Sequence, residues 1–295
     1  MLTKKLAFVF VLMIGFSLGA QNFFNDSFRT ITYTYDNDPY IIYDFTSIYD
    51  NASKIKATYF GQDAYDQFLK LKEEKDIVLA TTASFSSSMI FTGVSVGFCS
   101  ENGNILNKMP DKTMDAMVVL QSNSKNNGRI AIGDLDYDEV NFEPSSIFEH
   151  TLNPREKVLD TYSFFNLIEE QELSVFQTQL LYSYKKPNAS HFNDLYYGAG
   201  DRNRRFLAIA RKDNSIDNVI IDIPNNDYLM NAANSSKIIL EKDGFEVLYL
   251  MNLDTGCKDI LHVFNGTDLE NKRPKQAIRS GTIEHASNLL VYYKE

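Results

Sequence analysis

Two apolar runs flank a polar loop in the stretch Tyr249-Leu-Met-Asn-Leu-Asp-Thr-Gly-Cys-Lys-Asp-Ile-Leu-His-Val-Phe-Asn-Gly266. The loop begins at Asp254. The two runs predict buried strands, because Leu, Ile, Val and Phe side chains pack well in sheets. Gly256 lets the backbone turn where a side chain would not fit. Two interpretations are open: an ordinary β-hairpin, which we favour from the pattern alone, or a loop that holds a carboxylate between two strands as part of a site.

The first twenty residues predict a segment that directs export. Lys4 and Lys5 precede an apolar run at 6–16, and small residues follow at 17, 19 and 20. This is the order of a secretory signal peptide, and the run is too short to span a bilayer. We therefore expect a signal peptide at 1–20, one mature domain at 21–295, and a periplasmic or extracellular location. No later stretch is apolar for long enough to form a transmembrane helix.

The composition narrows the possible partners. Hydrophobic residues make up 44% of the chain, enough for a sizeable core, and aromatic residues make up 13%, which favours strands. The formal net charge of -10 argues against a nucleic-acid partner, because phosphate backbones are bound by clusters of Lys and Arg. It also argues against attraction to an anionic membrane surface.

The cysteines and histidines indicate no cofactor. Cys99 and Cys257 could form a disulfide in an oxidising compartment or remain two buried thiols, and their sequence separation does not decide between these states. The 4 histidines show no His-x-x-x-His spacing, and the cysteines show no Cys-x-x-Cys spacing. The sequence therefore predicts no metal site and no cofactor.

Alternating and apolar runs predict a β-rich chain with a few helices. We expect helices at 63–75, 164–172 and 228–242, and strands at 28–35, 40–49, 55–60, 77–80, 91–98, 105–106, 117–120, 129–133, 173–184, 205–210, 219–223 and 286–293. Asp63 would cap the first helix, and the strands between 91 and 133 would form a β-meander. The fold class is therefore α+β, with β-rich mixed sheets and flanking helices in a single domain.

Two polar stretches are candidate binding segments. Thr81-Thr-Ala-Ser-Phe-Ser-Ser-Ser88 could line a pocket with hydroxyls and backbone donors, or simply be a loop that leaves a strand. The segment 188–201 is rich in Asn, Asp, Gly and Tyr, a composition typical of exposed binding loops.

Four motifs, taken in order, resemble the phosphodiester glycosidase family. That family includes enzymes that remove N-acetylglucosamine from phosphorylated mannose, and bacterial exopolysaccharide-associated proteins. Its Ala-Ile-Asn-Gly-Gly-Phe-Phe motif resembles Ala80-Thr-Thr-Ala-Ser-Phe-Ser86, and its Arg-Thr-Ala-Leu-Gly strand resembles Arg205-Phe-Leu-Ala-Ile209. Its Asn-Leu-Asp-Gly-Gly-Gly-Ser-Ser loop is similar to Asn252-Leu-Asp-Thr-Gly-Cys-Lys-Asp259, and its closing Arg-Pro-Val-Ala-Asn-Ala-Leu to Glu284-His-Ala-Ser-Asn-Leu-Leu290. The resemblance covers roughly residues 40 to 295.

The resemblance implies a site for a carbohydrate or a glycosyl phosphodiester. Cleavage of a sugar-phosphate bond needs a cation beside the phosphate and a carboxylate near the sugar carbon. Arg205 is the candidate phosphate clamp, Asp254 the candidate carboxylate and His285 a candidate acid or base. A surface ion pair, a loop-forming Asp and a packed or surface His are the alternatives for these three. The implied substrate-binding residues are Thr82, Ser84, Asn252, Gly256 and Asn288.

The motifs also differ from the family where the family has glycines. This chain has Ala83, Ser84, Thr255 and Cys257 at those positions, and each Cβ narrows the space where a backbone N–H could approach an anion. Two functions are therefore open. The first is an exported hydrolase that acts on glycosyl phosphodiesters of surface or extracellular polysaccharide. The second is a non-catalytic protein on the same fold that binds glycans or another envelope component through 188–201.

Overall fold

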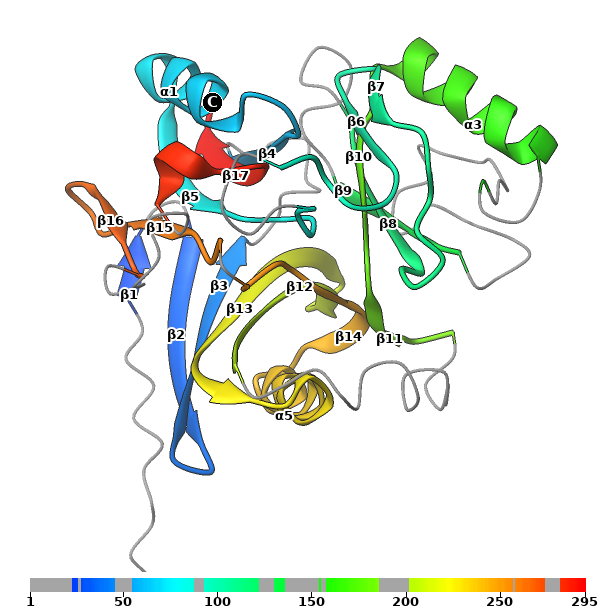
Figure 1. Ribbon diagram of the computed structural model, residues 1–295. Coiled ribbons are helices and arrows are strands. Elements are labelled where there is room, and N and C mark those ends of the chain that lie inside the picture. The colour runs from blue at the N-terminus through cyan, green and yellow to red at the C-terminus, as the bar shows by residue number, and fades with distance from the viewer. Residues whose placement is uncertain are drawn as a thin grey trace, which may run out of the picture.

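A computed structural model describes residues 23–25, 28–45, 55–87, 93–121, 130–135, 154, 158–185, 202–256, 258–273 and 282–295 (Figure 1). The predicted signal peptide at 1–20 and the predicted binding loop at 188–201 lie outside these residues.

Three sheets form the described core. The large sheet has the spatial order β1 (Phe23–Asn25), β2 (Phe28–Tyr35), β3 (Asp38–Phe45), β13 (Ser215–Asp227), β12 (Arg202–Lys212), β14 (Glu246–Asn252) and β11 (Leu180–Ser183). The β5 sheet has the order β16 (Leu269–Asn271), β15 (Leu261–Phe264), β5 (Asp76–Thr81), β17 (Leu289–Lys294) and β4 (Ile55–Phe60). The β8 sheet has the order β7 (Asn104–Asn107), β6 (Cys99–Glu101), β10 (Ser174–Thr178), β8 (Ala116–Leu120) and β9 (Ile130–Asp134).

Each sheet carries a helix (Figure 1). In the helix α1 (Ala64–Glu74), Phe68 packs into the cluster that covers the β5 sheet, and in α3 (Val158–Gln171), Phe164 packs into the cluster of the β8 sheet. In α5 (Leu229–Lys242), Ile239 packs into the core of the large sheet. A short 3-10 helix, η2 (Ile283–His285), precedes β17. The structure thus confirms the predicted α+β class, a single domain rich in sheet.

The predicted hairpin around Asp254 is wrong, because its two strands belong to different sheets. β14 pairs with β12 and β11 in the large sheet, whereas β15 pairs with β5 and β16 in the β5 sheet. From Val247 to Asn252 every residue of β14 is buried, as in a central strand with neighbours on both sides. The segment 253–260 therefore crosses from one sheet to the other.

Two smaller predictions also fail. The meander is wrong because β10 lies between β6 and β8, and residues 93–98 make only an isolated bridge between Ser86 and Ser95. Gly97 has a φ of 79°, which breaks the extended run there. Asp63 precedes α1 with a φ of 46° and makes no side-chain capping bond. The residue pattern therefore did not predict the positive φ of Gly97 and Asp63.

Two buried aromatic pairs join the three sheets. Phe45 of the large sheet stacks on Tyr292 of the β5 sheet with ring centroids 3.9 Å apart and an interplanar angle of 1°. Tyr59 of the β5 sheet stacks on Phe176 of the β8 sheet with centroids 4.8 Å apart. All four residues are fully buried, at 0% exposure, and lie in one core cluster. The aromatic content therefore holds the sheets together.

We expect the substitution Phe45→Ala to lower the free energy of unfolding by about 3 to 5 kcal/mol, because it leaves a cavity against Tyr292. Tyr162→Ala is the control: this side chain is 65% exposed, so its loss should change stability by about 0.5 kcal/mol or less. Urea denaturation of both variants measures the difference. Equal losses would contradict the role of the ring pair.

Candidate functional site

Three segments from different parts of the chain meet beside the crossover at 253–260. Thr82 Oγ1 donates to the carbonyl of Asp254 at 2.7 Å, and the Asp254 N–H donates to the carbonyl of Ala83 at 3.1 Å. Asn288 Oδ1 accepts from the N–H groups of Ala83 at 3.1 Å and Ser84 at 2.9 Å, and Asn288 Nδ2 donates to the Ser84 carbonyl at 3.0 Å. The structure thus brings together these four predicted site residues, and a fifth, Gly256, bonds the Asp254 carboxylate. We call Thr82, Ser84, Asp254 and Asn288 the Asp254 cluster.

Asp254 is the carboxylate of this cluster and is 9% exposed. Burial raises its pKa above the ordinary value of 3.8, and the charge of Asp259 adds to the rise. Hydrogen bonds from the backbone N–H groups of Gly256 and Ser86, and the positive charge of Arg202, act in the opposite direction. The Gly256 N–H lies 2.9 Å from Asp254 Oδ1, and a Cβ at this glycine would lie 3.1 Å from the same oxygen. Gly256 therefore allows the loop to fold closely around the carboxylate.

Arg205 does not occupy the position of a phosphate clamp. Its side chain is 0% exposed, and its five N–H groups are all engaged. Nε and Nη2 donate to Asp222 Oδ1 at 3.2 and 3.0 Å, and Nη2 also donates to Asp259 Oδ1 at 2.6 Å. Nη1 donates to Thr81 Oγ1 at 3.1 Å and to the Ile260 carbonyl at 3.0 Å. The alternative of a surface ion pair is also wrong, because the pair is fully buried.

Arg273 completes this buried ion cluster, which the sequence did not predict. Its Nε donates to Asp259 Oδ2 at 2.9 Å, and its Nη2 donates to Asp222 Oδ1. Burial alone would lower the pKa of Arg205, but the carboxylates of Asp259 and Asp222 outweigh it and raise that pKa. The one sequence signal was Asp222, a charge inside the apolar run Val219-Ile-Ile-Asp-Ile223. Such a charge is buried only when it is paired.

His285 and Asn252 do not join the Asp254 cluster by any hydrogen bond among the described residues. His285 is exposed on η2, and its Nδ1 is 3.0 Å from Thr282 Oγ1. Asn252 is 4% exposed, and its Nδ2 donates to Gln179 Oε1 at 2.8 Å in the neighbouring strand region. His285 is thus a surface histidine, which was the predicted alternative to a catalytic role. Asn252 contributes to the packing of its strand.

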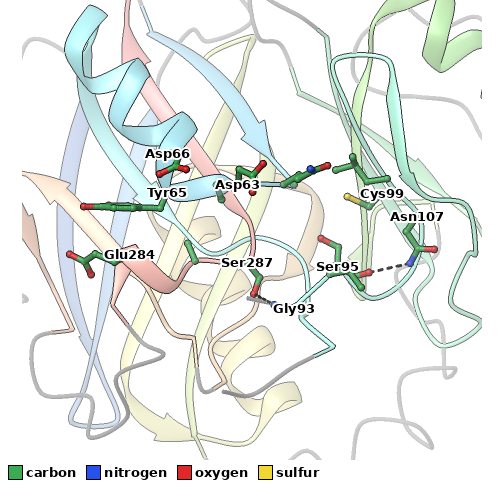
Figure 2. Close-up of a pocket in the computed structure, with 15 residues that line it drawn as sticks. Asp63, Tyr65, Asp66, Gly93, Ser95, Cys99, Asn107, Glu284 and Ser287 are labelled. Atoms are coloured by element: carbon green, nitrogen blue, oxygen red, sulfur yellow. Dashed lines mark hydrogen bonds between the residues drawn. The ribbon is translucent and has the colours of Figure 1, made fainter. Parts of the chain in front are cut away.

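Figure 2 shows a pocket of about 440 Å³, which is linked to the cluster by the contact between Ser95 and Ser84. We call it the α1 pocket, because the start of α1 forms one wall. It is lined by Gly61, Gln62, Asp63, Ala64, Tyr65, Asp66, Gly93, Val94, Ser95, Cys99, Leu106, Asn107, Glu284, Ala286 and Ser287. Ser95 Oγ lies 2.8 Å from Ser84 Oγ, and Ser86 Oγ donates to Ser287 Oγ at 3.0 Å. Ser95 and Ser287, which sequence reasoning missed, therefore connect the pocket to the loop 82–86.

The described residues contain no group of three or more His, Cys, Asp or Glu side chains that could hold a metal ion. Over the same residues, no helix is long and apolar enough to cross a membrane. Cys99 is a free, buried thiol whose Sγ lies 3.3 Å from the Tyr59 hydroxyl. Cys257 lies outside the described residues. Of the two states predicted for Cys99, the structure has the buried thiol.

Comparison with solved structures finds proteins of similar fold. The chain resembles the catalytic domain of zebrafish N-acetylglucosamine-1-phosphodiester alpha-N-acetylglucosaminidase, auto-inhibited by its pro-peptide, with a TM-score of 0.51 and 10% sequence identity. The match covers 91% of this chain and 83% of that chain. No family model and no curated protein matches the sequence. The similarity supports a distant relationship of fold.

Removal of the central arginine tests the buried ion cluster. We expect Arg205→Met to lower the free energy of unfolding by about 3 to 5 kcal/mol, because the buried carboxylates of Asp222 and Asp259 would then share the single guanidinium of Arg273. Arg211→Met is the matched control, since Arg211 pairs with Glu246 at 2.6 Å with side chains 45% and 59% exposed, and its loss should cost about 1 kcal/mol or less. Denaturation in urea compares the two. Similar values for both variants would argue against the cluster.

The raised pKa of Asp254 predicts a pH dependence of stability. Above pH 3.8 the Asp254 carboxyl group loses its proton in the unfolded chain but retains it in the folded protein. The retained proton stabilises the folded state, and this stabilisation is lost as the pH rises through the pKa of folded Asp254. Asp254→Asn has no proton to lose. The stability of the wild type relative to this variant should therefore decrease from pH 3.8 upward, measured by denaturation at a series of pH values. A constant difference would show that the carboxyl has its ordinary pKa.

Proposed function

We propose that the protein is an exported hydrolase that cleaves glycosyl phosphodiesters of surface or extracellular polysaccharide. The observation that carries the proposal is Asp254, a carboxyl group with a raised pKa where three separate segments meet. A carboxyl group that keeps its proton above its ordinary pH range can donate it to the leaving oxygen. The fold similarity supports this choice, because the zebrafish protein is named for action on a phosphodiester. Export is inferred from the sequence of residues 1–20.

Arg202 is the cation that this proposal assigns to the substrate phosphate, in place of Arg205. Arg202 lies at the start of β12 and is exposed, and its positive charge acts to lower the pKa of Asp254. Arg205 acts instead as a positioning residue, because its partner Asp259 lies on the same crossover as Asp254. The exposed Arg202 would thus bind the ligand, and the buried Arg205 would hold the loop in place.

A second candidate function is glycan binding without catalysis. It is favoured by a specific feature: the donors of Arg205 are all engaged, and side chains stand at 83, 84 and 255, where the motif has glycines. A ligand would then meet hydroxyl groups and one exposed arginine instead of a row of backbone N–H groups.

The substitution Asp254→Asn separates the two candidates. If Asp254 is the general acid, the variant should hydrolyse an activated N-acetylglucosamine phosphodiester on the order of 100-fold more slowly than the wild type. Asp268→Asn is the control, because Asp268 is an exposed carboxylate on the turn before β16 and should not affect turnover. Release of the chromophoric leaving group is measured for all three proteins. Absence of wild-type turnover across several sugars would favour the binding protein, and equal turnover by Asp254→Asn would remove Asp254 from the mechanism.

A further inference from the structure

A buried lysine and a serine meet at the wall of the α1 pocket. Lys258 lies on the crossover four positions after Asp254 and is 2% exposed. Its Nζ donates to the Oγ of Ser287, which is 5% exposed and lines the pocket. The Gly93 N–H also donates to this oxygen at 3.1 Å, as Figure 2 shows, and Ser86 Oγ donates to it at 3.0 Å. Three donors therefore surround one hydroxyl oxygen beside a cavity.

We propose that Ser287 is a nucleophile, that Lys258 is its general base, and that the α1 pocket hydrolyses small, uncharged acyl esters. A serine hydroxyl is a weak nucleophile until an adjacent base takes its proton, and a lysine held away from water is a recurring base for this purpose. With Lys258 neutral, the Ser287 hydroxyl donates to Nζ across the same contact, and the Gly93 N–H and the Ser86 hydroxyl that point at Oγ stabilise the negative charge that develops on it as the proton leaves. The contacts of Ser287 provide both conditions.

The reaction takes place in two balanced steps. In the first, the neutral amine of Lys258 accepts the Ser287 proton, and Oγ forms a bond to the acyl carbon. The bond from that carbon to the alcohol oxygen breaks, and the alcohol leaves with the proton from Lys258. In the second, water adds to the acyl-serine as Lys258 takes a proton, the bond between Oγ and the acyl carbon breaks, and Ser287 regains its proton. A carboxylic acid leaves, so the net reaction is ester plus water to alcohol plus acid.

The lining of the pocket selects the substrate class. Asp63, Asp66 and Glu284 stand at its walls, so a negatively charged ligand would be repelled. Tyr65, Val94 and Leu106 offer apolar contact to an acyl group. The volume of about 440 Å³ is near the lower end of the range for ligand pockets, which favours a short acyl chain. We therefore assign acetyl-sized esters of a neutral alcohol.

The pair is independent of the motif resemblance and of the proposed phosphodiester chemistry. In the two motifs that contain these positions, the family has Ser where this chain has Lys258 and Ala where this chain has Ser287. Both members of the pair thus differ from the family pattern. Failure of either proposal leaves the other intact, because the Ser287 proposal is tested by hydrolysis of an ester and the Asp254 proposal by hydrolysis of a phosphodiester.

The test uses the full-length protein with p-nitrophenyl acetate and, separately, with a fluorophosphonate probe followed by peptide mass spectrometry. We expect the probe to modify Ser287, and we expect Ser287→Ala to lower kcat/KM for the ester on the order of 100-fold. Lys258→Arg should lose a similar factor, because arginine keeps the positive charge but does not accept a proton.

Ser183→Ala is the matched control. Ser183 is 3% exposed, its Oγ has no hydrogen-bond partner, and it lies on β11 outside the pocket. This variant should hydrolyse the ester at the wild-type rate. Ser287→Ala removes only a hydroxyl group, and a thermal melt checks that it folds. The proposal is overturned if the wild type does not exceed buffer hydrolysis, if Ser287→Ala retains the wild-type rate, or if the probe modifies another residue.

Discussion

The buried ion cluster of Arg205, Arg273, Asp222 and Asp259 is the constraint on which the rest of the structure depends. Burial of four charges is costly, and the cost is offset only when every charge is paired and hydrogen bonded. Asp222 lies on β13 of the large sheet, whereas Asp259 lies on the crossover that leads into the β5 sheet. Arg205 also bonds Thr81 Oγ1 and the Ile260 carbonyl. One side chain therefore fixes the point where the two sheets meet.

The geometry around Asp254 follows from this constraint. The Leu253 N–H donates to the Arg205 carbonyl at 2.9 Å, and the Thr82 N–H donates to the Ile260 carbonyl at 3.2 Å. Both ends of the crossover are thereby attached to β12 and to the residues after β5. The Asp254 main chain, bonded to Thr82 and Ala83, has little freedom to move relative to them. A carboxylate on an otherwise irregular segment is thus held as firmly as one on a strand, as a catalytic group requires.

Most helices and strands could be predicted from the sequence, but their partners could not. The run at 246–252 is apolar because it lies in the centre of a sheet, and its periodicity records that burial without saying which strand lies beside it. The hairpin prediction failed for this reason. The same limit hid the ion cluster, since Arg205 meets Asp259 across 54 positions and Asp222 across 17. The α1 pocket was hidden too, because Ser95 and Ser287 are ordinary serines until the fold brings them together. The motif resemblance did indicate the Asp254 cluster, because ordered motifs carry information about contacts that local patterns lack.

Residues shared with the family motifs differ in what they indicate about activity. Arg205 and Asn288 are explained by the fold, because one pairs buried carboxylates and the other bonds the backbone of Ala83 and Ser84. Their presence would be needed in an inactive protein as well. Asp254 is different, because its carboxyl accepts a hydrogen bond that an Asn oxygen could also accept, and its ionised form is disfavoured by burial. A carboxylate that weakens the folded state where a neutral amide would serve is typical of a functional group. Asp254 therefore carries the argument for catalysis, and the buried arginine does not.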